Sequence, residues 1–193
     1  VAVSIEGAGS TSITVTQAAD NNYNTASKTV NLSVAKATPT LSFNNVVKNY
    51  GDSSFTLAAQ TQSSSGTLSY TSADNSVVSI SGSTATINGA GTSLITVTQS
   101  ETANYIAATS SFTITVNKID PTLSAFGVVT KTFGDSVFEI TPPTKDVDNS
   151  SSFTFTSSNA NIASITDNKV TINGAGTAVI TASLSANDNY NAG

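Results

Sequence analysis

The strongest constraint on this chain is that its sequence returns to the same landmarks at a nearly constant interval. The motif Ile-x-Gly-Ala-Gly stands at residues 5–9, 87–91 and 172–176, in steps of 82 and 85 residues. Other landmarks recur with it in the same order, which excludes coincidence and predicts tandem copies of one structural unit. They are Ile13-Thr14, Ile95-Thr96 and Ile180-Thr181; Asn22-Tyr23, Asn104-Tyr105 and Asn189-Tyr190; the Lys-x-x-Pro-Thr-Leu-Ser segments from Lys36 and Lys118; and Gly51-Asp52 and Gly134-Asp135.

The phase of this repeat predicts three segments. If each unit begins at the Lys-x-x-Pro-Thr-Leu-Ser segment, residues 36–117 form one complete repeat. Residues 1–35 are then the C-terminal part of a preceding repeat, and residues 118–193 are a repeat that lacks its last strand. Because cut units leave strand edges and core exposed, we expect the chain to be a segment of a longer array, with neighbouring repeats as its partners.

The complete repeat alternates apolar and Ser/Thr residues with a period of two, which predicts short strands with one buried face. Gly, Asn and Asp pairs between the strands supply turn chemistry. Short strands separated by frequent turns are typical of an antiparallel sandwich, so the predicted fold is all-β, with tandem immunoglobulin-like antiparallel β-sandwiches of about seven strands each. The expected strands lie at residues 41–43, 55–57, 68–70, 78–80, 85–87, 95–98 and 112–116.

Composition excludes several classes of function. The seven basic residues are all Lys and the net charge is −5, so the Arg fork that reads guanine or grips phosphate is missing and nucleic-acid binding is not expected. No apolar stretch approaches the ~20 residues of a membrane-spanning helix. Cys and His are absent, which removes the usual transition-metal ligands and nucleophile–base pairs. We therefore expect no enzyme, and no catalytic, cofactor-binding or metal-binding residues.

Two stretches of the last segment, residues 156–165 and 170–182, resemble a known family. They combine a Ser-Ser-Asn stretch, a strand, a Gly-Ala-Gly-Thr turn and an Ile-Thr strand, and residues 71–98 carry a looser version. This pattern resembles bacterial immunoglobulin-like domains of group 2, which are similar to the shafts of intimin- and invasin-like adhesins, large surface proteins and some phage appendages. The resemblance implies extracellular or cell-surface display rather than a reaction.

Several loops rich in glycine or in carboxylate and amide residues are candidate ligand sites. The Gly-Ala-Gly motifs lack the following Lys and helix of a phosphate-binding loop, which favours simple turns. Residues 20–22 and 187–189, Asp-Asn-Asn and Asn-Asp-Asn, offer oxygens to Ca²⁺, but Glu101 shifts the carboxylate in the middle copy, which favours a hydrogen-bonding role within the loop. A Lys–Asn crosslink near Lys48-Asp52 or Lys131-Asp135 needs a buried carboxylate, and the three glutamates do not stand at matching positions: Glu6, Glu101 and Glu139.

Polar and aromatic surface residues carry three further hypotheses. Flat Thr arrays are similar to ice-binding faces, although Thr is also an ordinary strand former on a solvated face; they lie at Thr14-Val15-Thr16, Thr96-Val97-Thr98 and Thr113-Ile114-Thr115. The recurring Tyr23, Tyr105 and Tyr190 suit sugar stacking, but a ring packed into the sandwich is the favoured interpretation. Asn31-Leu32-Ser33 and Asn149-Ser150-Ser151 match glycosylation acceptors.

The expected function is a non-catalytic structural spacer or stalk of an extracellular, cell-surface or filamentous assembly, adhesin-like in kind. Other copies in a filament are then further partners, with no nucleic acid and no membrane span in this segment. The alternative is a glycan- or protein-binding module, which predicts exposed aromatic residues. Phage or virion appendages, and a polymer whose strands complete a neighbour's cut unit, remain open as well.

Overall fold

The fold is all-β, as the sequence predicts. A computed structural model describes residues 2–147 and 150–193 of the chain. The described residues contain no helix, and therefore none with the length and apolar character needed to cross a membrane. The strands are β1 (Gly9–Gln17), β2 (Ala26–Val34), β3 (Leu41–Ser42), β4 (Val46–Asn49), β5 (Phe55–Thr56), β6 (Thr61–Gln62), β7 (Leu68–Ser72), β8 (Val78–Ser81), β9 (Thr84–Ile87), β10 (Gly91–Gln99), β11 (Ala108–Asn117), β12 (Phe138–Glu139), β13 (Phe153–Ser157), β14 (Ala163–Thr166), β15 (Lys169–Ile172) and β16 (Ile180–Leu184).

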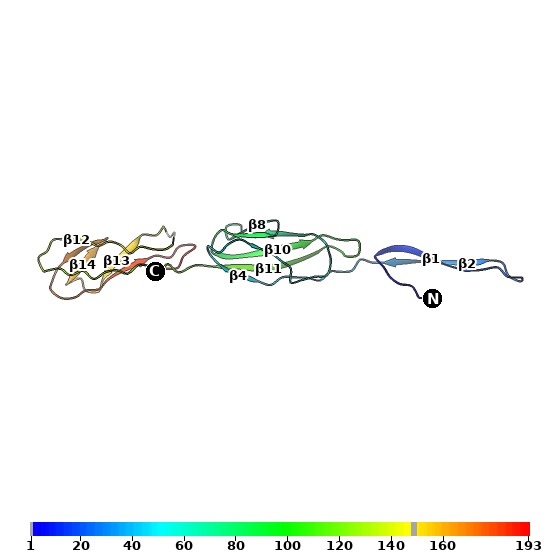
Figure 1. Cartoon of the computed structure of the whole chain (residues 1–193), viewed down its shortest axis with the longest axis horizontal. Helices are drawn as coiled ribbons and strands as arrows, with labels where there is room; N and C mark the ends of the chain where they lie inside the picture. Colours follow the sequence, from blue (N-terminus) through cyan, green and yellow to red (C-terminus); the bar gives the residue numbers. More distant parts are fainter. Residues whose placement is uncertain (1, 148–149) are drawn as a thin grey trace. The chain divides into compact units, whose positions relative to one another are not determined.

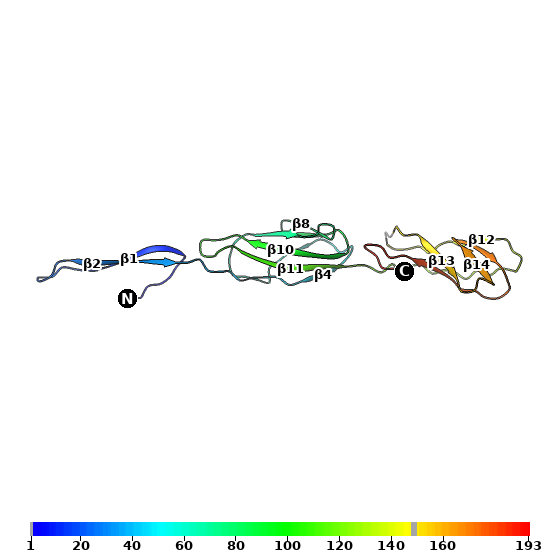
Figure 2. The same cartoon turned by 180° about the vertical axis from the view of Figure 1, so that it is seen from behind.

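The middle of the chain forms a β-sandwich of two sheets (Figures 1 and 2). One sheet has the order β4-β11-β10-β7 and the other the order β5-β9-β8, with β3-β6 as a separate short pair. All seven expected strands are present, which confirms the predicted fold class. Two strands were missed because their sequences carry little alternation: β6 consists of two polar residues, and β4 has adjacent valines, of which Val47 is exposed.

The core of this sandwich consists mainly of apolar side chains that alternate along the strands, with the polar Ser93 and Gln99 buried among them. On β10 every second residue is buried, in the order Ser93, Ile95, Val97 and Gln99. Strand β11 contributes its own alternating set in the same way. This is the period-two pattern that the sequence predicts for a half-buried strand. The most deeply buried apolar residues of the sandwich, each at most 4% exposed, are Val78, Ala85, Ile95, Val97, Phe112, Ile114 and Val116.

The sheet pairings recur along the chain in equivalent registers. Strand β7 pairs antiparallel with β10 from Leu68 opposite Gln99, and β13 pairs with β16 from Phe153 opposite Leu184. Likewise β5 pairs with β9, and β12 pairs with β15. The residues that face each other are those that the repeated sequence landmarks align. The same local sequence therefore specifies the same strand pairing twice.

The described residues fall into two compact units. Unit 1 comprises Val1–Val46, Ser53–Thr86 and Thr92–Thr115, and unit 2 comprises Val47–Asp52, Ile87–Gly91 and Val116–Gly193. Unit 1 contains the β1-β2 hairpin, and unit 2 contains the sheets β12-β15-β14 and β13-β16. The predicted repeat boundaries, residues 1–35, 36–117 and 118–193, stay a prediction.

Candidate functional site

Three loops that end in Asn-Tyr share one closed geometry. We call residues 20–23, 102–105 and 187–190 the Asn-Tyr loops. In each loop the first residue's backbone N–H donates to the Tyr carbonyl, at 2.9–3.0 Å. The Tyr N–H in turn donates to that first residue's side-chain oxygen: to Asp20 Oδ1 at 2.8 Å, Thr102 Oγ1 at 3.2 Å and Asn187 Oδ1 at 2.9 Å. The first position of the loop therefore needs a side-chain oxygen that accepts a hydrogen bond, and that oxygen can be charged or neutral.

This geometry bears on the calcium hypothesis. Asp20 Oδ1 accepts hydrogen bonds from the backbone N–H groups of both Asn22 and Tyr23, so its oxygen serves the loop. Asn187 does the same with an amide oxygen and no charge. Within residues 2–147 and 150–193, no three His, Cys, Asp or Glu side chains gather as a metal-binding group. The distances are those of the hydrogen-bonding role that the sequence favours.

Within unit 1, an Asn-Tyr loop contacts a Gly-Ala-Gly turn far away in the sequence. We call residues 7–9, 89–91 and 174–176 the Gly-Ala-Gly turns. The backbone N–H of Ala8 donates to Asn104 Oδ1 at 2.9 Å. A Cβ atom added to Gly7 would stand 2.9 Å from the same oxygen, so a larger residue there would displace the asparagine side chain. The glycine before the alanine therefore leaves room for the asparagine.

The same contact occurs within unit 2. The backbone N–H of Ala90 donates to Asn189 Oδ1, again at 2.9 Å. Next to it, the ring of Tyr190 meets the ring of Tyr50 edge to face, with centroids 5.6 Å apart and an interplanar angle of 84°. Tyr190 is only 7% exposed. An edge-to-face pair of this kind is a favourable aromatic geometry, so this second contact combines a hydrogen bond with ring packing.

Two of the three Asn-Tyr loops, those of residues 102–105 and 187–190, are also tied to the segment that begins the predicted repeat. Ala37 forms a parallel bridge with Tyr105, and Ile119 forms the same bridge with Tyr190. The lysine before each bridge approaches the same loop: Lys36 Nζ lies 3.5 Å from a Glu101 carboxylate oxygen, and Lys118 Nζ donates to the Asn187 carbonyl at 2.6 Å. Loop and connecting segment are therefore held together in both places.

The glycines of the Gly-Ala-Gly turns have a backbone reason to be glycine. Gly9, Gly91 and Gly176 have φ angles of 141°, 145° and 143°, a region that other residues rarely adopt. Strands β1 and β10 begin at Gly9 and Gly91. A strand rather than a helix follows, so these motifs are turns and lack the helix N-terminus of a phosphate-binding loop.

The Gly-Asp pairs close a second recurring turn, with an aromatic residue at its tip. We call residues 49–52 and 132–135 the aromatic-Gly-Asp turns. Asp52 N–H donates to the Asn49 carbonyl at 3.1 Å, and Asn49 N–H donates to Asp52 Oδ2 at 2.9 Å. Residues 132–135 repeat both bonds, at 3.1 and 3.0 Å, and the two glycines have φ angles of 87° and 99°. The predicted turn role is what these bonds show.

The groups that a Lys–Asn crosslink would need make other contacts in the structure. Lys131 Nζ lies 4.9 Å from the centre of the Phe138 ring, a cation–π contact. The Asp52 carboxylate serves its own turn. Glu101 and Glu139 are more than half exposed and face Lys36 and Lys169 at 3.5 and 3.8 Å, so neither is the buried carboxylate that such chemistry needs.

Other sequence candidates lie on solvated strand faces. Thr14 Oγ1 and Thr29 Oγ1 are 2.9 Å apart across the β1-β2 hairpin and exposed, which is an ordinary cross-strand hydroxyl pair. Asn31 is exposed, and its Oδ1 accepts a bond from the Ser12 hydroxyl at 2.8 Å. The second glycosylation motif begins at Asn149, which lies outside the described residues.

Two aspartates with shifted pKa values also act through local hydrogen bonds. The Ser76 hydroxyl and backbone N–H both donate to Asp74 and lower the pKa of that carboxyl below its ordinary value. Thr122 lowers the pKa of Asp146 in the same way. At the position that matches Asp74, Asn159 Oδ1 accepts the Asn161 N–H at 3.0 Å. An uncharged residue thus performs the same bond, which again indicates a turn role.

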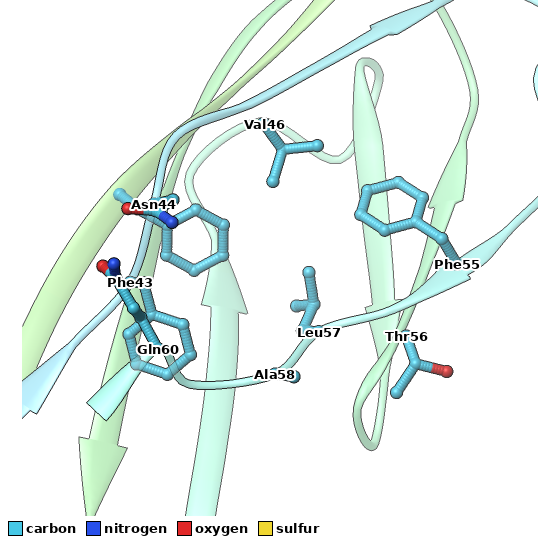
Figure 3. A pocket seen from close by; sticks show the side chains of 9 residues that line it. Phe43, Asn44, Val46, Phe55, Thr56, Leu57, Ala58 and Gln60 are labelled. Atoms are coloured by element: carbon cyan, nitrogen blue, oxygen red, sulfur yellow. The ribbon is translucent and has the colours of Figure 1, made fainter. Parts of the chain in front are cut away.

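Unit 1 also contains an apolar hollow of about 280 Å³, drawn in Figure 3. Phe43 stacks on Phe112 at 5.1 Å between ring centres, and the Phe55 side chain points into the hollow while Thr56 points away. Asn44 and Gln60 supply amides at its rim, and no charged side chain lines it. Its lining residues are Phe43, Asn44, Val46, Phe55, Thr56, Leu57, Ala58, Gln60 and Phe112.

The sequence indicates the residues of the turn–loop contacts but does not indicate that they contact each other. It treated the Gly-Ala-Gly turns and the Asn-Tyr loops as separate candidates, while the structure pairs Ala8 with Asn104 and Ala90 with Asn189. The signal that joins them is their shared recurrence: the turns of residues 7–9 and 89–91 each contact the Asn-Tyr loop of the following copy of the repeat rather than that of their own copy. The hollow was missed because its residues are scattered strand-core positions.

Comparison with known proteins adds little. No protein-family model matches the chain, and no curated protein matches it. Among solved structures, it is similar to a SusE-like, surface-located polysaccharide-binding protein from the heparin utilisation locus of Bacteroides thetaiotaomicron, at 14% identity and a TM-score of 0.30. The match covers 93% of this chain and 36% of that protein. A TM-score this low supports no argument about function, and the group 2 resemblance stays a prediction.

We predict that each asparagine protects one distant amide from hydrogen exchange. In Asn104→Ala, exchange at the Ala8 N–H should rise roughly threefold to tenfold, as expected for the loss of one hydrogen bond of about 1 kcal/mol. In Asn189→Ala, only the Ala90 N–H should respond. Amide exchange measured by NMR on the whole chain checks this.

The two variants are controls for each other, and Asn22→Ala is a third, since Asn22 makes no such contact within the described residues. The pairing would be contradicted if the exchange rates of the Ala8 and Ala90 amides were the same in all three variants as in the parent chain.

Proposed function

We propose that the chain is a non-catalytic structural spacer of an extracellular, cell-surface or filamentous assembly, of the kind that forms adhesin shafts or phage appendages. The observation that carries this proposal is the recurrence of one contact. A Gly-Ala-Gly turn donates to the asparagine of an Asn-Tyr loop twice, at the same 2.9 Å distance. A contact repeated at the interval of the sequence repeat has the character of a connection between successive segments.

The details of that contact suit a connection that resists bending. The loop that receives the turn is bridged to the connecting segment at Ala37 or Ile119. Turn, loop and segment are thereby joined over only a few residues, and short, hydrogen-bonded connections leave a chain less freedom than a flexible linker does. A series of such connections would form an extended array that holds an attached domain at a distance.

The surface chemistry supports the same role. The strand faces that meet solvent carry Ser and Thr, only 10% of the residues are charged, and the net charge is −5. The recurrent residues described above act in turns and in the core. Location outside the cell rests on the resemblance to group 2 bacterial immunoglobulin-like domains.

The spacer proposal predicts a narrow distribution of distances across the unit 2 contact. Spin labels placed at Val47→Cys, in the segment of unit 2 that carries Tyr50, and at Thr156→Cys, an exposed position of β13 in the same unit, report this distance by pulsed electron resonance. The chain has no cysteine of its own. Adding Asn189→Ala and Tyr50→Ser removes the hydrogen bond and the ring pair, and should broaden the distribution.

The matched control is Asn22→Ala with Phe133→Ser, the equivalent residues, for which the described part of the chain shows no such contact. It should leave the distribution unchanged. A distribution in the parent chain as broad as in the Asn189→Ala, Tyr50→Ser variant would overturn the spacer proposal.

A second candidate function, a binding module, rests on the hollow in Figure 3. Its walls combine the Phe43, Phe55 and Phe112 rings with two amides at the rim. Aromatic faces with nearby polar groups suit a sugar ring, and a volume just below that of most ligand pockets fits one or two rings. This candidate concerns a small glycan and is compatible with a spacer.

Binding at the hollow predicts localised NMR shifts. Titration with glucose- and N-acetylglucosamine-based disaccharides should shift amides of residues 43–46 and 55–58 first. Phe55→Ala, which removes a wall of the hollow, should weaken binding about tenfold, as expected for one stacked aromatic ring. Thr56→Ala, whose side chain points away, should bind like the parent. An absence of shifts at millimolar sugar would rule out this candidate.

A further inference from the structure

Two of the Gly-Ala-Gly turns follow directly on an asparagine. Residues 86–92 and 171–177 have the same sequence, Thr-Ile-Asn-Gly-Ala-Gly-Thr, so Asn88 and Asn173 each stand before a glycine. A glycine has no side chain to cover its backbone nitrogen and has unusual conformational freedom. Its nitrogen can therefore attack the side-chain amide of the preceding asparagine, a residue that is already among the thermolabile ones. The repeated turn thus carries a chemically reactive bond.

In unit 2, hydrogen bonds hold both groups that would react at Asn173. The Asn173 Nδ2 donates to the Ala160 carbonyl at 2.8 Å and to the Ser164 hydroxyl at 2.9 Å. The N–H of Gly174, whose nitrogen is the attacking atom, donates to the Ile162 carbonyl at 3.2 Å. Attack requires the amide to turn and the nitrogen to be released, so these bonds must break first.

We propose that Asn88 and Asn173 are sites of spontaneous deamidation, and that the hydrogen bonds of the folded turn set the rate at Asn173. The nitrogen of the following glycine bonds to the side-chain Cγ, and the Cγ–Nδ2 bond breaks. Nδ2 leaves as ammonia, taking the proton of the glycine nitrogen. Water then opens the succinimide ring at either of its carbonyl carbons, which gives aspartate or isoaspartate. Each event adds one negative charge to a chain whose net charge is −5.

The first copy of the repeat indicates which product the turn accommodates. Glu6 stands at the repeat position of Asn88. Two residues later, the Ala8 N–H donates to Asn104 Oδ1 at 2.9 Å. A carboxylate at this position is therefore compatible with the turn–loop contact, and the aspartate product should keep it. Isoaspartate differs, because it routes the backbone through the former side chain and adds a methylene group to the main chain.

The position of that methylene group gives the modification a structural consequence. In unit 2, the Ala90 N–H donates to Asn189 Oδ1 at 2.9 Å, and Ala90 follows Asn88 by two residues. A longer backbone at Asn88 should move this N–H out of line with its acceptor. Deamidation would then loosen the contact slowly and irreversibly. This inference goes beyond the spacer role, because it concerns how the connection changes with time.

Peptide mapping of the whole chain by mass spectrometry, after incubation in mildly alkaline buffer, tests the proposal. In denaturant the two sites should lose their amides at the same rate, because residues 86–92 and 171–177 are identical. In the folded chain Asn173 should react more slowly than in denaturant. Ser164→Ala removes one acceptor of the Asn173 amide and should speed the reaction there roughly threefold to tenfold, as expected for the loss of one hydrogen bond.

The matched control is Ser79→Ala, which changes the equivalent serine of the preceding copy and should leave the rate at Asn173 unchanged. The proposal is overturned if neither asparagine loses its amide in denaturant, or if Asn173 reacts as fast in the folded chain as in denaturant. It is also overturned if Ser164→Ala and Ser79→Ala give the same rate at Asn173.

The loosening of the contact has a separate readout. In chains incubated until isoaspartate has formed from Asn88, hydrogen exchange at the Ala90 N–H should be faster than in the fresh chain. The variant Asn88→Asp, which carries the charge without the longer backbone, should exchange at the fresh rate. Equal exchange in the incubated chain and in Asn88→Asp would contradict the proposed effect on the contact.

Discussion

The structure depends on one hydrogen bond that is made twice: the side-chain oxygen of an asparagine accepts the alanine N–H of a Gly-Ala-Gly turn. The residues around it follow from its geometry. In unit 1 the glycine before the alanine leaves room for the Asn104 side chain, whose Oδ1 would lie 2.9 Å from a Cβ on Gly7. Glycine follows the alanine because the backbone there has a positive φ angle. The adjoining tyrosine adds ring packing in unit 2.

Variation at one loop position shows which physical property matters. Asp20, Thr102 and Asn187 close three loops of the same shape, although only the first carries a charge. Asp74 and Asn159 show the same exchange in another turn. Geometry, rather than electrostatics, is therefore the common requirement, which explains how a chain with few charged residues maintains its turns.

The all-β fold and its seven main strands could be predicted from the sequence because alternation reports burial directly, as at Ile95 and Val97. Strand β6 could not, since Thr61 and Gln62 pair with β3 without burying an apolar residue. At the candidate site, the residue types and their turn roles were predictable from local chemistry. The partner of each loop was not, because Ala8 and Asn104 are far apart in the sequence and nothing local to either residue indicates the other. The hollow at Phe55 could not be predicted either, because its lining residues come from separate strands and loops.

In the intact chain, two Asn-Tyr loops bind Gly-Ala-Gly turns through the asparagine side chain. Nuclear Overhauser effects in solution test these contacts most directly. The account predicts cross-peaks between the ring protons of Tyr50 and Tyr190, and between the Ala8 amide proton and the Asn104 side chain. It predicts none from the Tyr23 ring to another aromatic ring of the same copy in dilute solution. Absence of both predicted cross-peaks from a folded chain with dispersed amide signals would contradict the account.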